Sequence, residues 1–334
     1  MYEKSYTIIY MTRHQSTIKM KRVDLDLTRL SLGTAPLAGL FSDVQDKDSD
    51  LLIKTALSQG IKYFDTAPLD GHGSAETRLG RVLKTVKEPY ILQTKVGRIL
   101  TRVEKANSMP WFPGADPHIE PVFDYSRDGI LKSFNDSLER LGVDHIDIAL
   151  MHDAENHVDQ AINEAYPVLA ELKAQGMIKA IGVGLNFCDV AMRIMKEVDL
   201  DIALIAGRYT LLDQTAQREL LPYAIERKVD ITIGGVFNYG VLANPVKGAT
   251  FEYLPASDEI IAKAQKIGAF LGERGIPLTA AALQFPLRHP AITSVLTGSR
   301  SSEELLSNIA DFDRELPANI WTELEDAGLI ERLP

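Results

Sequence analysis

Short apolar runs alternate with longer amphipathic stretches along most of this chain. Eight such runs predict β-strands, at residues 30–33, 62–65, 91–96, 146–152, 180–184, 202–206, 230–235 and 294–297. Between most of them lies a segment with helical spacing, such as residues 161–173, whose apolar positions recur every three or four residues. Strands that alternate with helices in this way predict a parallel sheet with crossover helices.

Eight strand–helix units within 334 residues predict a closed (β/α)₈ TIM barrel of the α/β class. The alternative is an open doubly wound sheet, whose dinucleotide-binding form carries G-x-G-x-x-G after its first strand. Here Gly33 is followed instead by Thr34-Ala35-Pro36-Leu37. We therefore expect one barrel domain over residues 27–334, with an added helix at 318–329. An N-terminal extension and short hairpin would occupy residues 1–26.

Two connections between predicted strands are unusually long. Residues 97–125 contain four prolines together with Trp111 and Phe112, and residues 237–255 form the second long connection. Long loops in compact domains are usually functional or mobile. Because the first of them follows the third strand, we expect it over the barrel mouth, with Trp111 contacting a substrate. A self-packed surface loop is the alternative interpretation.

The composition of the chain limits which kinds of partner and which cellular compartment we expect. The net charge of −10 argues against nucleic acid or an anionic membrane as a partner. No run of about 18 apolar residues predicts a transmembrane helix, and the apolar residues 8–11 are too few for a secretion signal. Cys188 is the one cysteine, so no intrachain disulfide can form. We expect it to be a buried packing residue rather than a nucleophile. We expect a cytoplasmic protein with a small-molecule substrate and no metal site; the oligomeric state is left open.

Charged side chains stand at the ends of three successive predicted strands. Asp65 ends the second strand, Lys95 lies near the end of the third, and His152 ends the fourth. The carboxyl ends of barrel strands meet at one mouth, where chemistry gathers. Each residue alone could be structural, but together they favour a site. Asp65 and Lys95 could form a buried pair that shifts the pKa of a third group nearby.

Nearly the whole chain, from about residue 27 to 308, resembles the aldo-keto reductases, especially the aldose 1-dehydrogenases and the similar pyridoxal dehydrogenases. The segments that carry the resemblance are LGTAPL (32–37), FDTAPL (64–69), DYSRDG (124–129), LERLG (138–142), IGVG (181–184), AGRYTLL (206–212), GGVFN (234–238) and ALQFP (282–286). The resemblance implies hydride transfer between NADP or NAD and the anomeric carbon of an aldose, giving a lactone. A related aldehyde or alcohol, including a pyridoxal-type substrate, is also implied.

The resemblance also implies a catalytic group made of Asp65, Lys95, His152 and the residue at position 70. The family has a tyrosine there, and this chain has Asp70. The reference pKa of a tyrosine is ~10 and that of an aspartate ~3.9. Beside Lys95, Asp70 is expected to ionise still more readily, so that it cannot donate a proton. We therefore expect impaired activity. The alternatives are oxidation with the carboxylate as base and a non-catalytic NAD(P)-binding protein on the same scaffold.

The segment at 295–300 predicts an anion site. A strand ends, a glycine turn follows and a helix starts near Ser301, so free N–H groups suit a phosphate. The resemblance implies cofactor contacts from Gly33, Thr34, Asn186, Gly235, Val236, Phe237, Asn238, Gly298, Ser299, Arg300, Glu304 and Asn308, and a substrate contact from Arg208. Arg300 favours NADP, whereas the neighbouring acidic residues leave NAD open.

Overall fold

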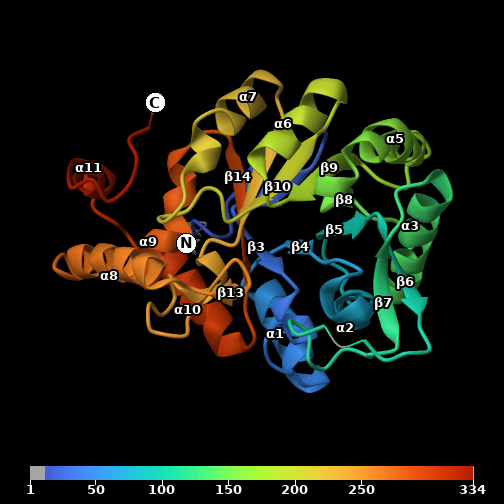
Figure 1. The fold of residues 1–334 in the computed structure, drawn as a ribbon, viewed down its shortest axis with the longest axis horizontal. Helices are drawn as coiled ribbons and strands as arrows, with labels where there is room; N and C mark the ends of the chain where they lie inside the picture. The colour runs from blue at the N-terminus through green and yellow to red at the C-terminus, as the bar shows by residue number, and fades with distance from the viewer. Residues whose placement is uncertain (1–11, 108, 334) are drawn as a thin grey trace, which may run out of the picture.

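A closed barrel of parallel strands forms the centre of the molecule. The computed structural model describes residues 12–107 and 109–333. The barrel strands are β3 (Leu30–Gly33), β4 (Tyr63–Asp65), β5 (Ile91–Val96), β8 (Ile148–His152), β9 (Ala180–Leu185), β10 (Ile202–Ala206), β11 (Asp230–Gly234) and β14 (Ile292–Gly298). They pair in chain order, and β14 closes onto β3 (Figure 1). The expected (β/α)₈ barrel is confirmed.

Helices surround this barrel and bury the outer faces of its strands. They are α1 (Asp46–Ser58), α2 (Ser74–Leu83), α3 (Arg127–Leu141), α4 (Val158–Gln160), α5 (Tyr166–Ala174), α6 (Cys188–Glu197), α7 (Leu220–Glu226), α8 (Asp258–Gly272), α9 (Leu278–Gln284), α10 (Ser302–Asp313) and α11 (Ile320–Asp326). Three of them begin at serine caps, Ser126, Ser257 and Ser301, which accept backbone N–H groups. Within the described part of the chain, no helix is long and apolar enough to cross a membrane.

Two predicted helices differ in detail from the structure. Residues Ala161–Ala165, at the start of the helix predicted over 161–173, form a π-helical turn ahead of α5. The added C-terminal helix expected over 318–329 is the shorter α11. Single 3₁₀ turns occur at Pro36–Ala38, Asp70–Gly73, Ala154–Asn156, Thr215–Gln217, Asn238–Gly240 and Phe285–Arg288.

A short antiparallel hairpin covers the N-terminal end of the barrel. It consists of β1 (Thr17–Lys19) and β2 (Asp26–Thr28). Met20, Leu25 and Leu27 of this hairpin are buried in one apolar cluster with residues that begin the barrel strands, such as Tyr63. The mouth at the other end is therefore the open one. Residues 8–11, considered above as a signal segment, lie outside the described residues.

The two long connections contain strands that the sequence pattern did not predict. In the first, β6 (Arg98–Arg102) and β7 (Ile119–Phe123) pair as an antiparallel ribbon. In the second, β12 (Thr250–Phe251) pairs with β13 (Leu254–Pro255). Pro121 lies in β7, where a two-stranded ribbon tolerates the missing N–H of proline. Each connection thus contains one short antiparallel ribbon.

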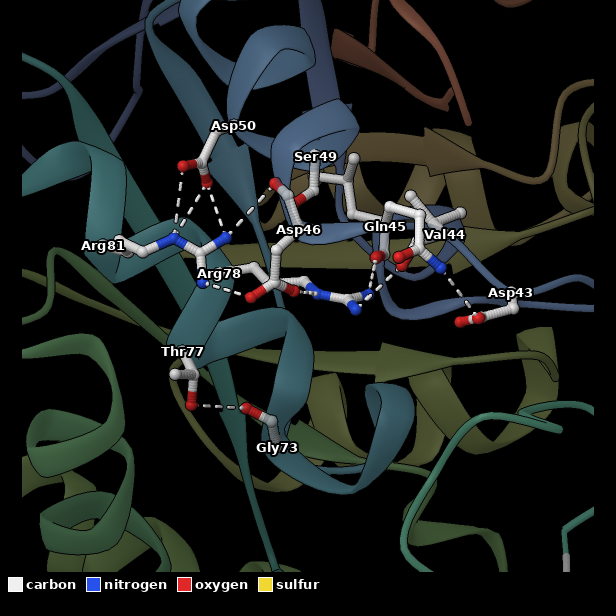
Figure 2. Close-up of polar contacts among 11 residues, drawn as sticks. Asp43, Val44, Gln45, Asp46, Ser49, Asp50, Gly73, Thr77, Arg78 and Arg81 are labelled. Carbon is white, nitrogen blue, oxygen red and sulfur yellow. Dashed lines mark hydrogen bonds and ion pairs between the residues drawn. The ribbon is translucent and has the colours of Figure 1, made fainter.

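Charged side chains fix the connection between β3 and α1 (Figure 2). Asp46 of α1 pairs with Arg78 and Arg81 of α2, each at 2.9 Å, and Asp50 pairs with Arg81 at 2.6 Å. Arg78 also donates to the carbonyl of Val44 at 2.9 Å. The loop that leads from the barrel mouth to α1 is therefore held against α2.

Candidate active site

One cavity of about 350 Å³ lies at the C-terminal ends of the barrel strands. Asp65, Asp70, Lys95 and His152, which the resemblance placed in one catalytic group, all line it. They come from the end of β4, the turn that follows it, β5 and the end of β8. The barrel topology therefore gathers these four side chains around one space.

Asp65 and Lys95 form the buried ion pair that the sequence suggested. Lys95 Nζ lies 2.8 Å from Asp65 Oδ1 and 2.9 Å from Oδ2, and it also donates to the carbonyl of Thr66 at 2.9 Å. Gln93 donates a further hydrogen bond of 2.7 Å to Asp65 Oδ1. Each charge is thus met by hydrogen-bonding partners, which a buried pair requires.

A sharp turn after β4 places Asp70 at the cavity. The backbone is left-handed at Gly71 (φ 57°), His72 (φ 51°) and Gly73 (φ 89°). A Cβ added at Gly71 would lie 2.2 Å from Ser74 Oγ, so this position requires glycine. Asp70 lies at the start of this turn, 9% exposed, and lines the cavity.

The protonation of Asp70 differs from the sequence-based expectation. Burial raises the pKa of Asp70 to about 7. The negative charges of Asp65 and Glu76 also raise this pKa, whereas the positive charge of Lys95 lowers it. The expectation that Asp70 ionises more readily than usual is therefore wrong. The pKa of Asp70 is raised because its carboxyl is buried away from water, while Lys95, which could stabilise the ionised form, is already paired with Asp65. Near neutral pH both protonation states of Asp70 are populated.

His152 is a neutral imidazole at the cavity. Burial lowers its pKa to about 3, which outweighs the opposing effect of Asp153. Nδ1 of His152 is buried and has no hydrogen-bond partner among the described residues, and its carbonyl accepts the Tyr125 hydroxyl. The ring can therefore donate one N–H to an oxygen without carrying a charge.

The long connections bring further side chains to the cavity. Trp111, the expected substrate contact, lines it, and Phe112 does so as well. Tyr253, from the turn between β12 and β13, also lines it and packs against Trp111 with ring centroids 5.3 Å apart. The sequence showed that both connections were long, but it did not single out Tyr253.

Arg98 and Asp153 were also missed. Arg98 Nη2 lies 2.7 Å from Asp153 Oδ2, and both residues line the cavity. Asp153 directly follows His152, so its place at a strand end was the available signal. Arg98 lies just past β5, at the start of a segment that read as loop.

Arg208, an expected substrate contact, forms ion pairs within the protein, and its role toward a substrate stays a prediction. It is not among the residues that line the cavity. It pairs with Asp213 at 3.1 Å and with Glu252, and its Nε donates to the carbonyl of Asn186 at 2.7 Å. Arg208 thus ties the β12–β13 turn to the barrel, next to Tyr253. Asn186 does line the cavity.

The segment after β14 has features that suit a phosphate. Ser301 caps α10, a helix of 12 residues, by accepting the N–H of Glu304 at 3.2 Å. Asn308 donates to Ser299 Oγ at 3.1 Å, and Arg300 pairs with Glu304 at 3.0 Å. The positive end of α10 and the guanidinium of Arg300 therefore lie beside the same turn.

The other expected cofactor segments carry buried polar atoms and close backbone approaches. Thr34 Oγ1 and Asn238 Oδ1 are buried without a hydrogen-bond partner among the described residues. Gly235 has φ +64°, and a Cβ added there would lie 3.0 Å from the backbone N of Gly207. A Cβ at Gly298 would meet Pro36 at 2.5 Å. The unpartnered oxygens of Thr34 and Asn238 can form hydrogen bonds with a polar ligand. Gly235 and Gly298 leave no room for a side chain, because other parts of the chain lie against them.

Two other sequence-based expectations concern Cys188 and metals. Burial raises the pKa of the half-buried Cys188 thiol to about 11, so that it is no nucleophile at neutral pH. Among the residues that the structure describes, no group of three or more His, Cys, Asp or Glu side chains could hold a metal ion.

Comparison with known proteins identifies the family. The Aldo/keto reductase family profile matches residues 29–328. Pyridoxal 4-dehydrogenase from Microbacterium luteolum is 40% identical over 92% of this chain and 96% of its own length. D-threo-aldose 1-dehydrogenase from Pseudomonas sp is 36% identical over 92% and 95%. The holo form of an aldo-keto reductase from Bacillus halodurans shares the fold, with a TM-score of 0.76 at 24% identity over 95% and 97% of the two chains. The chain belongs to the aldo/keto reductase family, whose members are oxidoreductases that use NAD(P)H.

Proposed function

We propose that this protein is an NAD(P)-dependent dehydrogenase that oxidises the anomeric carbon of an aldose to a lactone, or acts on a related alcohol or aldehyde. The observation that carries the proposal is the convergence of Asp65, Asp70, Lys95 and His152 on one cavity. The names of two relatives, a pyridoxal and an aldose dehydrogenase, support these substrate classes. A pyridoxal-type aldehyde is therefore the second class to test.

The cofactor residues of the proposal are those of the strand ends described above. The turn from Gly298 to Arg300 and the start of α10 would hold a phosphate and the adenosine half. Thr34, Asn186 and Asn238 would hold the nicotinamide half. The bound nicotinamide supplies a hydride acceptor or donor, and it could be that of NADP or of NAD.

The protein's own part in the reaction is to hold the substrate oxygen and to move one proton. Neutral His152 donates an N–H to the oxygen. In oxidation the O–H proton passes to an ionised Asp70 carboxylate, and in reduction a protonated Asp70 returns it to the oxygen. The Lys95 charge opposes the rise in the Asp70 pKa and keeps it near neutrality.

Turnover is expected to be slow compared with that of a tyrosine enzyme. General acid–base catalysis requires contact of about 3 Å between the proton donor and the acceptor. An aspartate side chain is several ångströms shorter than a tyrosine, so Asp70 reaches the substrate oxygen poorly or through a water. The reach of the side chain, more than its ability to hold a proton, therefore limits the rate.

The test is a panel of aldoses and pyridoxal, with NAD and NADP in separate reactions, followed at the absorbance band of the reduced nicotinamide. We expect slow turnover that disappears in His152→Phe and persists in the control Asp43→Asn. Asp43 is exposed and does not line the cavity. Calorimetric binding of NAD(P) without turnover of any substrate would instead identify a non-catalytic NAD(P)-binding protein.

A further inference from the structure

The charged side chains around the cavity leave one carboxyl group unpaired. Three aspartates and two cations line the space. Asp65 pairs with Lys95 at 2.8 Å, and Asp153 pairs with Arg98 at 2.7 Å. Asp70 has no cationic side chain within 4.0 Å anywhere in residues 12–107 and 109–333. A desolvated carboxylate without a partner is unfavourable, so this position requires either a proton or a positive charge from a ligand.

Aromatic side chains line the same cavity. Trp111, Phe112 and Tyr253 all line it, and they come from the two long connections. The rings of Trp111 and Tyr253 lie 5.3 Å apart, and Tyr239 packs against Tyr253 at 4.3 Å. The face of an aromatic ring attracts a cation electrostatically, most strongly when water is excluded. An unpaired carboxyl beside an aromatic wall is the combination that recognises an organic ammonium ion.

We propose that the cavity binds a substrate that carries a protonated amine, whose ammonium group pairs with the Asp70 carboxylate against Trp111, Phe112 and Tyr253. This inference rests on the proposed function and narrows its substrate class to amino alcohols, amino sugars and amino aldehydes. A carboxylate has two oxygens and about four lone-pair sites. One oxygen of Asp70 can therefore accept a hydrogen bond from the ammonium group, while the other accepts the proton of the substrate hydroxyl.

The proposal has a pH signature that a neutral substrate lacks. The titratable and charged groups that act on Asp70 are Asp65 of β4, Glu76 of α2, Lys95 of β5, Asp153 after β8 and Tyr253 of the β12–β13 turn. Below a pH of about 7 the free protein holds a proton on Asp70, and an ammonium ligand must displace it. Affinity for the ammonium should therefore rise about tenfold per pH unit up to 7 and then level off. A primary amine keeps its charge in this range, because its pKa resembles the ~10.4 of lysine.

The test compares two ligands of nearly the same shape, benzylamine and benzyl alcohol, by calorimetry at pH 6 and pH 8. At pH 8 we expect benzylamine to bind the parent about ten- to a hundredfold more tightly, the range for a charge-assisted hydrogen bond. At pH 6 this preference should shrink about tenfold, and binding should release a proton. Asp70→Asn should abolish the preference, whereas the control Asp43→Asn, which removes an exposed charge, should keep it.

Equal affinity of the two ligands for the parent, or a preference that survives Asp70→Asn, would overturn the proposal. A second contrary result is an Asp70→Asn variant that keeps its preference for benzylamine but binds NADP⁺ more weakly and NADPH as before. The carboxylate would then interact with the cationic nicotinamide ring rather than with a substrate amine. Turnover of 1,3-benzenedimethanol and of 3-(aminomethyl)benzyl alcohol separates this inference from the proposed function. Equal turnover of both rejects the amine preference alone. Amine binding without turnover of any substrate rejects the proposed function alone.

Discussion

Lys95 Nζ lies 2.8 Å from one carboxylate oxygen of Asp65 and 2.9 Å from the other, and both side chains are only 7% exposed. A lysine held in this way by one aspartate is not free to neutralise a second. The protonation of Asp70 is therefore governed mainly by its burial, which raises its pKa to about 7. By holding Lys95 at Asp65, the buried pair leaves Asp70 without a cationic partner, and the pKa of Asp70 stays high.

The first prediction concerns this pair. Lys95→Met should lower the free energy of unfolding by about 3–5 kcal/mol, because it leaves the Asp65 carboxylate buried without its partner. Urea unfolding followed by circular dichroism measures the change. The double variant Asp65→Asn with Lys95→Met should recover part of the loss, since no uncompensated charge remains. A Lys95→Met variant as stable as the parent would show that Asp65 is solvated or protonated.

The second prediction concerns the pH dependence of kcat/KM for a neutral aldose. Oxidation requires the ionised form of Asp70, so kcat/KM should rise about tenfold per pH unit up to about 7 and then level off. Reduction requires the protonated form, so kcat/KM should be level below 7 and fall above it. Steady-state rates in both directions between pH 5 and 9 check this. Parallel profiles in the two directions would mean that another group moves the proton.

Much of the barrel could be predicted because buried parallel strands are continuous apolar runs with polar ends. The predicted runs 30–33, 91–96 and 202–206 coincide with β3, β5 and β10. The β6–β7 ribbon could not be predicted in this way. Three prolines between the two strands and a fourth within β7 are typical of a loop, and the register pairs Arg98 with Phe123, 25 positions along the chain.

The site was predictable mainly where strand ends fix it, although the length and aromatic residues of one connection also predicted Trp111 at the cavity. Asp65, Lys95 and His152 follow from barrel topology, which brings strand ends to one mouth. Tyr253 and Arg98 lie in the long connections, whose direction depends on tertiary packing. The pKa of Asp70 depends on its burial. A sequence can indicate which charged residues lie near a carboxyl group, but it does not show how much water the folded chain removes from that group.

The third prediction concerns cofactor affinity and choice. Arg300→Ala should weaken binding of NADP by about 1–3 kcal/mol, because it removes charge-assisted hydrogen bonds to a phosphate. Glu304→Gln should shift the preference toward NADP, since Glu304 now holds the Arg300 guanidinium at 3.0 Å. Dissociation constants for NAD and NADP from calorimetry measure both changes. If both variants bind the two cofactors like the parent, the turn after β14 is not the phosphate site.

The fourth prediction concerns the long connection of residues 97–125. Trp111→Ala should raise KM for bulky substrates severalfold and alter the order of substrate preference, because it removes an aromatic wall of the cavity. The dissociation constant of NAD(P) should stay within about twofold of the parent. Exposed Val122, on β7 and outside the cavity lining, provides the control Val122→Ala. An unchanged substrate pattern in Trp111→Ala would mean that this connection only packs.

The last prediction concerns Asp70→Tyr, which should raise turnover of a neutral aldose by about 10²–10⁴-fold, the usual contribution of general acid–base catalysis. Asp65, Lys95 and His152 already surround the position, and a cavity of about 350 Å³ lies beside it. A phenol reaches further than a carboxyl and can both donate and accept a hydrogen bond. The gain should be largest for reduction above pH 7, where Asp70 is mostly ionised and has no proton to give.

Asp70→Phe is the matched control for this variant, because it fills the same space without a hydroxyl. Steady-state rates for the parent and both variants, measured in both directions with one aldose, decide the matter. If Asp70→Phe gains as much as Asp70→Tyr, the effect is one of packing rather than proton transfer. If the parent is already as fast as Asp70→Tyr, the carboxyl reaches the substrate oxygen without difficulty, and the slow turnover attributed to its short reach is wrong. The preference for a protonated amine should disappear in both variants, because neither presents a carboxylate to it.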